Sequence, residues 1–320
     1  MKVLLTSTSF QDCDGAHKEL LNQQGWEVSY LRGPLKKSEI IDEIAKYDAL
    51  ICGDDELDRE VLEKGAGGSL KFISKYGVGL DRIDLDAAKE FRIPVTNCPG
   101  VNQIAVAEHV LAMIFTYFKN IHLSHEITSK GGWNRPLGRE LFGKKIGIIG
   151  LGAIGKEVAK RTPYLGLETY VYDTNLDETF VEENKLIALA SVKEIFLMCD
   201  IVTLHVPLTE STKGLVSNEL LQSFTRKGLI LVNTSRAGLI NEETILSAIK
   251  DGILGGYLTD VLVVEPMNKG CVLRAQNKVL ITPHIGSRTV ENIQKQGVKA
   301  VDNLINMIID YKNIYGEIRS

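Results

Sequence analysis

Cysteine is scarce in this chain of 320 residues, and long uncharged apolar runs are absent. The five cysteines are scattered, odd in number and form no CxxC pair. This pattern argues against a disulfide framework and favours buried, reduced thiols in a cytoplasmic protein. No apolar run approaches the ~20 residues that span a membrane. No basic segment precedes the strand-like start of the chain, so we expect no signal peptide.

An excess of charge of one sign is also missing. The 37 Lys and Arg residues nearly balance the 41 Asp and Glu residues, which leaves a formal net charge of −4. We therefore expect neither a nucleic acid nor a membrane as a partner. Internal repeats beyond strand–helix alternation, low-complexity segments and heptad arrays are absent too, which leaves a globular protein long enough for two domains.

Strand-like and helix-like segments alternate through the N-terminal third of the sequence. Short apolar runs predict strands, and amphipathic stretches between them predict helices. The expected strands are 3–5, 27–30, 49–52, 72–75 and 94–97, and the expected helices are 15–24, 38–45 (with Ser38 as its N-cap), 58–63 and 85–90. Such alternation is typical of a parallel, doubly wound sheet.

A second block of alternation begins at Lys144. Its expected strands are 145–149, 169–172, 201–205, 229–233, 256–261 and 279–282. Apolar residues at steps of three and four predict a long helix over about 102–128 and another over 289–309. The predicted fold class is α/β, with two doubly wound, parallel-sheet (Rossmann-like) domains.

A glycine-rich turn follows the first strand of this second block. Gly150 permits a tight turn, Gly152 lets the backbone approach a pyrophosphate, and Gly155 lets the next helix pack close to the sheet. That helix would direct its N-terminal amides toward the phosphates. A lone GxGxxG also occurs in ordinary turns, but the strand before it and the helix after it favour dinucleotide binding.

Asp173 lies about 20 residues further on, at the end of the next strand. A carboxylate at this place can accept both hydroxyls of an adenosine ribose. Its neighbours Thr174, Asn175, Asp177 and Glu178 supply no positive charge. Because an acid repels a 2′-phosphate, the sequence favours NAD over NADP. A solvated aspartate at a strand end is the alternative interpretation.

Three charged residues, Arg236, Glu265 and His284, follow later strands of the same block, where open α/β sheets bind ligands. A guanidinium can grip a carboxylate bidentately and polarise the adjacent carbonyl. An imidazole can exchange a hydroxyl proton while a hydride moves to or from a nicotinamide. A carboxylate bonded to the second ring nitrogen fixes the tautomer and favours the protonated ring. The three types together predict interconversion of a 2-hydroxy acid and a 2-oxo acid.

Each of these residues, taken alone, has a commoner structural interpretation. A histidine after a strand is usually structural, and an arginine there is usually solvated. Only their combination downstream of a dinucleotide motif favours catalysis, and we expect no metal site.

The sequence resembles the D-isomer-specific 2-hydroxyacid dehydrogenases, a family that includes phosphoglycerate, glycerate and D-lactate dehydrogenases, over nearly its whole length. The resemblance rests on the segments 75–81 (KYGVGLD), 97–102 (NCPGVN), 107–109 (AEH), 150–155 (GLGAIG), 205–208 (HVPL), 233–238 (NTSRAG), 260–266 (DVLVVEP) and 283–287 (PHIGS).

This resemblance implies roles for individual residues. Arg236 would anchor the substrate carboxylate and carbonyl, His284 would be the acid/base, and Glu265 its partner. The implied further substrate contacts are Gly77, Val78 and Gly79, through their backbone amides, and Asn102. The implied coenzyme contacts are Ala153 and Ile154 at the pyrophosphate, His205 and Pro207 on the adenine side, Thr234 near the nicotinamide ribose, Asp260 at the carboxamide and Gly286 over the nicotinamide. A packing role remains the better interpretation of His205.

The resemblance also implies a domain organisation. Residues 1–99 plus 289–320 would form the substrate domain and residues 100–288 the NAD-binding domain, with the substrate in a cleft between them. The helix at about 102–128 would be the arm of a homodimer, although a helix of the domain core is the alternative.

The identity of the acid stays open. Phosphoglycerate-specific members usually carry an arginine after the strand equivalent to 49–52, whereas this chain has Gly53-Asp54-Asp55, and two acids would repel a phosphate. An NAD(H)-sensing corepressor with little turnover would keep the same three charged residues and is the alternative function. Oxidation of formate or phosphite is a third hypothesis for the function. Cys98 lies beside the expected active-site loop, which suggests that thiol reagents inhibit.

Overall fold

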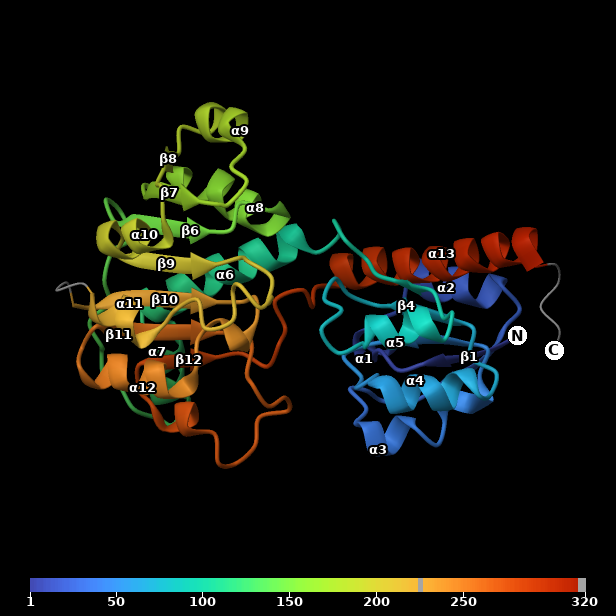
Figure 1. Cartoon of the computed structure of the whole chain (residues 1–320). Coiled ribbons are helices and arrows are strands. Elements are labelled where there is room, and N and C mark those ends of the chain that lie inside the picture. The colour runs from blue at the N-terminus through green and yellow to red at the C-terminus, as the bar shows by residue number, and fades with distance from the viewer. Residues whose placement is uncertain (224–226, 316–320) are drawn as a thin grey trace. The chain divides into compact units, whose positions relative to one another are not determined.

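The computed structural model describes residues 1–223 and 227–315, which form two compact units (Figure 1). Unit 1 comprises Met1–Asn102 and the chain from Arg288 onward, and unit 2 comprises Gln103–Ser287. Each unit is built around its own parallel sheet. The predicted fold class, α/β with two doubly wound parallel sheets, is confirmed.

The sheet of unit 1 has five strands. They are β1 (Lys2–Leu5), β2 (Glu27–Tyr30), β3 (Ala49–Cys52), β4 (Phe72–Lys75) and β5 (Val95–Thr96), in the order β2-β1-β3-β4-β5. All neighbouring pairs are parallel, and the central strands β1 and β3 are buried and almost wholly apolar. Continuous apolar strands are what a parallel sheet covered on both faces requires.

The helices of unit 1 include the last helix of the chain. They are α1 (Thr8–Asp12), α2 (Ala16–Gln23), α3 (Lys37–Ile40), the 3₁₀ turn η1 (Ile44–Lys46), α4 (Arg59–Ala66), α5 (Leu85–Glu90) and α13 (Val290–Tyr315). In Figure 1, α13 lies beside α2, and it also packs on β4. Its Ala300, Val301 and Leu304 share a core with Val3 and Phe10. The predicted helix over 38–45 is wrong, because α3 ends at Ile40, and Ser38 lies inside its first turn.

The sheet of unit 2 has seven parallel strands. They are β6 (Lys145–Ile149), β7 (Glu168–Tyr172), β8 (Ile187–Ala188), β9 (Ile201–Leu204), β10 (Leu229–Asn233), β11 (Leu254–Thr259) and β12 (Val279–Ile281), in the order β12-β11-β10-β9-β6-β7-β8. The chain adds strands on one side of β6 and then crosses to its other side at β9. Ligands of open α/β sheets bind beyond the carboxyl ends of the strands at such a crossing.

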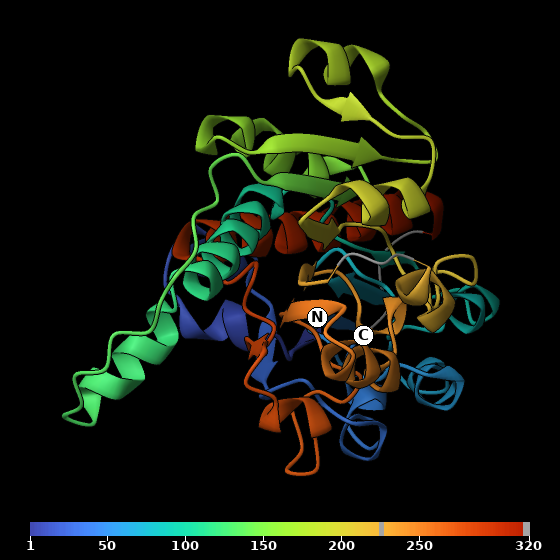
Figure 2. The same ribbon diagram turned by 90° about the vertical axis from the view of Figure 1, so that its left-hand side faces the viewer.

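Helices cover both faces of this sheet (Figure 2). They are α6 (Gln103–Phe118), α7 (Ile121–Ser129), α8 (Ala153–Arg161), η2 (Pro163–Leu165), α9 (Glu178–Glu183), α10 (Val192–Met198), α11 (Asn218–Gln222), η3 (Ala237–Leu239), α12 (Glu242–Lys250) and η4 (Val272–Ala275). Successive residues of β6 point to opposite faces. Ile148 therefore shares a core with α6 and α8, and Ile149 shares one with α10 and α12.

The predicted single helix over 102–128 is wrong. The structure has α6 (Gln103–Phe118) and α7 (Ile121–Ser129), which meet at a bend of 63°. Asn120 at the break has a φ of 51°, a left-handed conformation that a helix cannot include and that Asn tolerates better than most residues. α6 is a core helix that buries Val110, Met113 and Ile114, whereas α7 buries no residue. In the described ranges no single helix is long and apolar enough to cross a membrane, and only this bent pair reaches the required length and composition.

The contact between α13 and α2 leaves no space for a side chain at Gly297. A Cβ there would lie 2.6 Å from the Cβ of His17, a fully buried residue of α2. We expect Gly297→Ala to force the two helices apart and to lower the free energy of unfolding by about 1–3 kcal/mol, despite the better helix propensity of alanine. Urea denaturation measures the change. Lys295→Ala, on the exposed side of the same helix, is the control, and equal midpoints for the two variants would contradict the close contact.

Candidate active site

The glycine turn after β6 is packed too tightly for side chains at two of its three glycines. Gly150 has a φ of +96°, and a Cβ there would lie 2.6 Å from the carbonyl oxygen of His205. A Cβ at Gly155 would lie 1.9 Å from the carbonyl oxygen of Gly150. Gly152 differs, because the space beside it is open and it forms the N-cap of α8. The turn thus presents bare backbone and the amino end of α8 to an approaching anion.

Asp173 is fixed against this turn. Its Oδ2 accepts a hydrogen bond of 2.6 Å from the amide of Leu151, and its Oδ1 accepts one of 2.9 Å from the amide of Asn175. The acid at the end of β7 therefore braces the turn at the end of β6. The glycine turn and the acid, which are the two features of a dinucleotide motif, are thus joined by a hydrogen bond.

The strand ends next to this turn also suit a dinucleotide. The hydroxyl Oγ1 of Thr234, just after β10, is enclosed and has no hydrogen-bond partner within the described part of the chain. An enclosed hydroxyl without a partner lowers the free energy of unfolding by about 1–3 kcal/mol, and a hydrogen bond to a ligand would restore this stability. This hydroxyl and the open space at Gly152 fit a bound dinucleotide.

Arg236 follows β10 in a turn that a buried asparagine organises. Asn233 is fully buried, its Oδ1 accepts a bond of 3.1 Å from the amide of Ser235, and its Nδ2 donates one of 2.9 Å to the carbonyl of Arg236. The Ser235 hydroxyl donates to the carbonyl of Leu204, at the end of β9. The backbone under the guanidinium is thereby fixed to two strands, while the side chain itself is half-buried.

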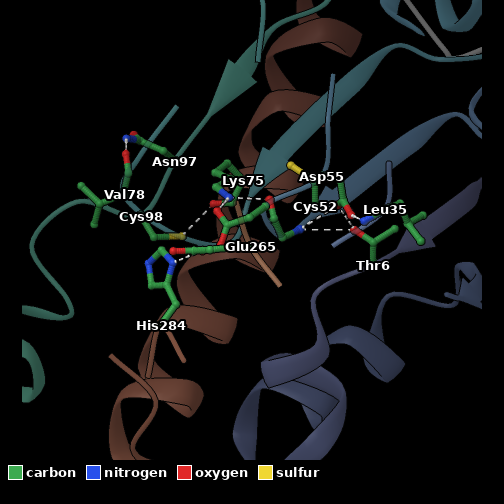
Figure 3. Close-up of polar contacts among 12 residues, drawn as sticks. Thr6, Leu35, Cys52, Asp55, Lys75, Val78, Asn97, Cys98, Glu265 and His284 are labelled. Carbon is green, nitrogen blue, oxygen red and sulfur yellow. Dashed lines mark hydrogen bonds and ion pairs between the residues drawn. The ribbon is translucent and has the colours of Figure 1, made fainter. Parts of the chain in front are cut away.

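His284 and Glu265 form a hydrogen-bonded pair (Figure 3). Nδ1 of His284 lies 2.8 Å from Oε2 of Glu265, and Oε1 of Glu265 accepts a bond of 2.8 Å from the amide of Leu262. The carboxylate is thus held by its own loop and orients the imidazole. A carboxylate on Nδ1 places a proton there and assigns proton exchange to Nε2. The histidine side chain is 40% exposed, so the ring is accessible to a substrate.

The loop that carries His284 is held by the buried carboxylate of Asp260. Oδ1 accepts a bond of 2.6 Å from the hydroxyl of Thr282 and one of 2.9 Å from the amide of Ile285, and Oδ2 accepts one of 2.7 Å from the amide of Gly286. Burial alone would raise the pKa of Asp260, but the hydrogen bonds from His109, Thr282 and the two amides outweigh it and lower the pKa. The charged form therefore persists in the interior.

These bonds also support an unusual backbone conformation. His284 has a φ of 54°, which costs a residue other than glycine on the order of 1–3 kcal/mol. Its own amide donates to the carbonyl of Thr282 at 3.0 Å. A Cβ at Gly286 would lie 2.9 Å from Oδ2 of Asp260, so glycine is required for the carboxylate to reach the amide. Strain of this kind is common where a side chain must be aimed at a ligand.

Sequence reasoning missed two residues of this network, His109 and Thr282. Nε2 of His109, on α6, lies 3.0 Å from the hydroxyl of Thr282 and 3.4 Å from Oδ1 of Asp260. His109 lies in the segment 107–109, for which the family resemblance implies no role. The spacing in sequence, more than 170 residues from Thr282, gives no signal that the two meet.

The loop at 77–79 lies in unit 1, at the end of β4. Gly77 has a φ of +142°, and a Cβ there would lie 3.2 Å from Cε of Lys75. The loop is braced by its carbonyls, since Val78 accepts a bond of 2.7 Å from Nδ2 of Asn97 and Gly77 accepts one of 2.8 Å from the amide of Cys98. These two hydrogen bonds fix the backbone of the loop. The side chain of Val78 is exposed.

The two acids after β3 do not both face solvent, which corrects the argument from their charge. Asp55 is buried and accepts hydrogen bonds from the hydroxyl of Thr6 and from the amides of Leu35 (2.6 Å) and Gly53 (3.1 Å) (Figure 3). Burial raises the pKa of Asp55, against these hydrogen bonds. Asp54 forms an ion pair of 2.6 Å with the buried ammonium of Lys75. The sequence Gly53-Asp54-Asp55 therefore gives much less repulsion of a phosphate than two solvated carboxylates would.

The suggested reactivity of Cys98 is not favoured by its surroundings. The side chain is fully buried, and burial raises the pKa of its thiol, which keeps it protonated and unreactive at neutral pH. Cys52 is similar, and burial raises its pKa to about 12. Within the described residues, no group of three or more His, Cys, Asp or Glu side chains is placed to hold a metal ion.

His205 is a packing residue at the turn between β9 and the loop that follows. Its Nε2 lies 2.9 Å from the hydroxyl of Thr203, and its enclosed Nδ1 has no partner in the described part of the chain. Burial lowers the pKa of His205 to about 3. The ring is therefore neutral at physiological pH, and the backbone carbonyl of His205 borders the glycine turn at Gly150.

Comparison with known proteins shows which family the chain resembles. A family model described as "D-isomer specific 2-hydroxyacid dehydrogenase, NAD binding domain" matches residues 111–286. The hydroxypyruvate reductase of Thermotoga maritima is 33% identical over 290 residues, which cover 89% of this chain and 92% of the relative. The D-3-phosphoglycerate dehydrogenase of Archaeoglobus fulgidus is 33% identical over 292 residues, which cover 90% of this chain and 54% of the relative. The apo-structure of D-lactate dehydrogenase from Escherichia coli is 25% identical, with a TM-score of 0.85 and coverage of 99% and 98%.

The chain belongs to the D-isomer specific 2-hydroxyacid dehydrogenase family. The matched domain is the NAD-binding domain of that family, so the prediction of NAD as the coenzyme is confirmed. The chain spans about half the length of the phosphoglycerate dehydrogenases that it matches.

The depressed pKa of His205 makes stability depend on pH. The folded ring resists protonation down to about pH 3, whereas the unfolded ring binds a proton below about 6.5. The free energy of unfolding should therefore fall as the pH drops below about 6.5, by about 1–2 kcal/mol at pH 5. His205→Asn should reduce this loss, as urea denaturation at pH 7.5 and pH 5 will show. An identical pH dependence in wild type and His205→Asn would disprove the neutral ring.

Proposed function

We propose that this protein interconverts a D-2-hydroxy acid and the corresponding 2-oxo acid with NAD as the coenzyme. The observation that carries the proposal is the pair of His284 and Glu265, 2.8 Å apart, at the carboxyl end of the sheet that also carries the glycine turn and Asp173. The membership of the family supports the same reaction class.

In the proposed mechanism, three side chains have separate roles. When bound, the coenzyme supplies or accepts a hydride. Arg236 binds the substrate carboxylate and polarises the adjacent carbonyl, because a guanidinium offers two parallel donors. Nε2 of His284 donates a proton to the carbonyl oxygen during reduction and removes it during oxidation. Glu265 holds the ring in place and stabilises the imidazolium form through Nδ1.

The remaining predicted residues have proposed binding roles. Gly150, Gly152, Ala153, Ile154 and Gly155 receive the pyrophosphate, and Asp173 receives the adenosine ribose. Thr234, Pro207 and His205 border the coenzyme, and Asp260 with Gly286 shapes the loop beside the nicotinamide. The amides of Gly77, Val78 and Gly79, together with Asn102, bind the substrate.

The relatives act on different acids by their names, which include phosphoglycerate, hydroxypyruvate and lactate. The Asp54–Lys75 pair removes the strongest argument against a phosphorylated acid. The substrate class is therefore proposed as a small D-2-hydroxy acid, with phosphorylated and unphosphorylated members to be compared directly.

The central test is NADH oxidation with a panel of 2-oxo acids, which includes hydroxypyruvate, phosphohydroxypyruvate, pyruvate and glyoxylate. We expect turnover with at least one acid, and a fall in kcat of about 10²–10⁴ in His284→Ala, because proton transfer is lost. NADH binding, followed by its fluorescence, should remain.

A second pair of variants tests the role of Glu265. Glu265→Gln should lower kcat with little change in NADH affinity, whereas Glu182→Gln, at an exposed glutamate of α9, should change neither. Tight NADH binding without turnover of any acid would overturn the dehydrogenase proposal and favour an NAD(H) sensor. Full turnover in His284→Ala would remove the acid/base role.

We also propose that the chain forms a homodimer through an arm, residues 121–137, made by α7 and the segment that follows it. Figure 2 shows α7 extending away from the sheet of unit 2. The arm exposes large apolar side chains, namely Ile121 (52%), Leu123 (36%), Trp133 (81%) and Leu137 (94%). An exposed group of this kind is typical of an interface with another chain.

The arm predicts a change in assembly on substitution. Trp133→Glu combined with Leu137→Glu should convert the dimer to a monomer in sedimentation velocity, while the circular dichroism spectrum is retained. Tyr164→Glu, at a 93% exposed tyrosine outside the arm, is the control. A wild-type protein that sediments as a monomer, or a double variant that remains dimeric, would contradict this arm as the interface.

A further inference from the structure

Unit 2 has a pocket of about 380 Å³ at the amino edge of its sheet. Its lining residues include those that come directly before four strands: Lys144 before β6, Asp200 before β9, Gly228 before β10 and Lys278 before β12. The glycine turn lies beyond the carboxyl ends of the same strands. The pocket is therefore separated from the proposed coenzyme site by the length of the sheet.

Four cationic side chains line this pocket: Arg139, Lys144, Lys227 and Lys278. The one acid among the lining residues is Asp200, whose Oδ2 already accepts a hydrogen bond of 2.9 Å from the amide of Lys145. Within residues 1–223 and 227–315, none of the four cations forms an ion pair.

A structural explanation for these cations is that they complement helix ends. Helices of an α/β unit finish at the amino edge of the sheet, and their carboxyl ends attract positive charge. However, none of the four side chains donates a hydrogen bond to a carbonyl in the described part of the chain. The end of α12 is closed by backbone instead, where the amide of Gly252 donates to the carbonyl of Ile249. Helix capping therefore does not account for the cluster.

We propose that this pocket binds a small anion that carries a phosphate or diphosphate group. Like charges around a concave surface repel one another and concentrate counter-ions, so a multivalent anion is the favoured occupant. Arg139 offers a planar fork that matches phosphate oxygens, and the three lysines add point charges. The volume suffices for pyrophosphate or a small phosphate ester, and Phe118 and Ile230 supply an apolar wall. Neither the coenzyme nor the 2-hydroxy acid needs this site.

The test is isothermal titration of the full chain with pyrophosphate in a phosphate-free buffer at low ionic strength. Saturating NADH is present throughout, so the glycine turn is occupied and does not contribute. We expect one saturable site per chain, with an affinity that falls as chloride is added, because salt screens exposed charges. Inorganic phosphate and fructose 1,6-bisphosphate, titrated in the same way, distinguish a free anion from a phosphate ester as the preferred ligand.

Matched variants locate the binding. Lys227→Gln with Lys278→Gln should weaken pyrophosphate at least about tenfold, since two charge-assisted contacts are removed. Lys193→Gln with Lys312→Gln removes the same charge from exposed positions elsewhere and should leave the affinity unchanged. NADH affinity should be the same in all of them, which also reports correct folding. If the double pocket variant does not fold, Arg139→Gln, at an exposed arginine, is the deciding variant and should show the same loss.

Absence of a saturable site in the NADH-bound wild type would overturn the proposal. Equal pyrophosphate affinity in the pocket variant and the control variant would overturn it as well. Both outcomes are independent of turnover with any 2-oxo acid, so they leave the proposed dehydrogenase activity unaffected.

Discussion

The carboxylate of Asp260 is the interaction on which the rest of the proposed site depends. It is 2% exposed, and it collects hydrogen bonds from the hydroxyl of Thr282 and from the amides of Ile285 and Gly286, with His109 close by. These contacts keep it ionised in the interior and hold His284 in a left-handed conformation. His284 is paired with Glu265 in that conformation of the loop. A buried acid, rather than an acid in contact with the reacting atoms, thus determines where the proposed proton donor points.

The two edges of the seven-stranded sheet have different chemistry. The carboxyl edge gathers the glycine turn, Asp173 and the three charged side chains of the proposed reaction, as topology requires of an open α/β sheet. The amino edge gathers four cations around a pocket with one engaged acid. The same strands therefore connect an edge suited to a coenzyme with an edge suited to an anion.

Much of the fold was predictable from local pattern, because each strand of a parallel sheet is a short apolar run. The predicted bounds of 145–149 and 229–233 coincide with β6 and β10. The short elements were not predictable, because β8 has only two residues and α9 to α11 lack a long apolar period. The helix over 102–128 was predicted as continuous since its apolar spacing continues through Asn120, and periodicity carries no signal of a left-handed residue. The pairing of Glu265 with His284 could be inferred from residue types, whereas the network of His109, Thr282 and Asp260 depends on contacts between distant segments.

The hydrogen bond from the amide of Leu151 to Asp173 links the proposed ribose contact, and with it the proposed selectivity for NAD, to the geometry of the glycine turn. Replacing the acid to admit a 2′-phosphate would remove repulsion and, at the same time, release the support under the pyrophosphate. An engineered change of coenzyme in this scaffold therefore calls for a neutral residue that still accepts that amide, such as asparagine or serine, with the positive charge introduced at a neighbouring position. A substitution of Asp173 would therefore change the coenzyme selectivity and the rigidity of the glycine turn together.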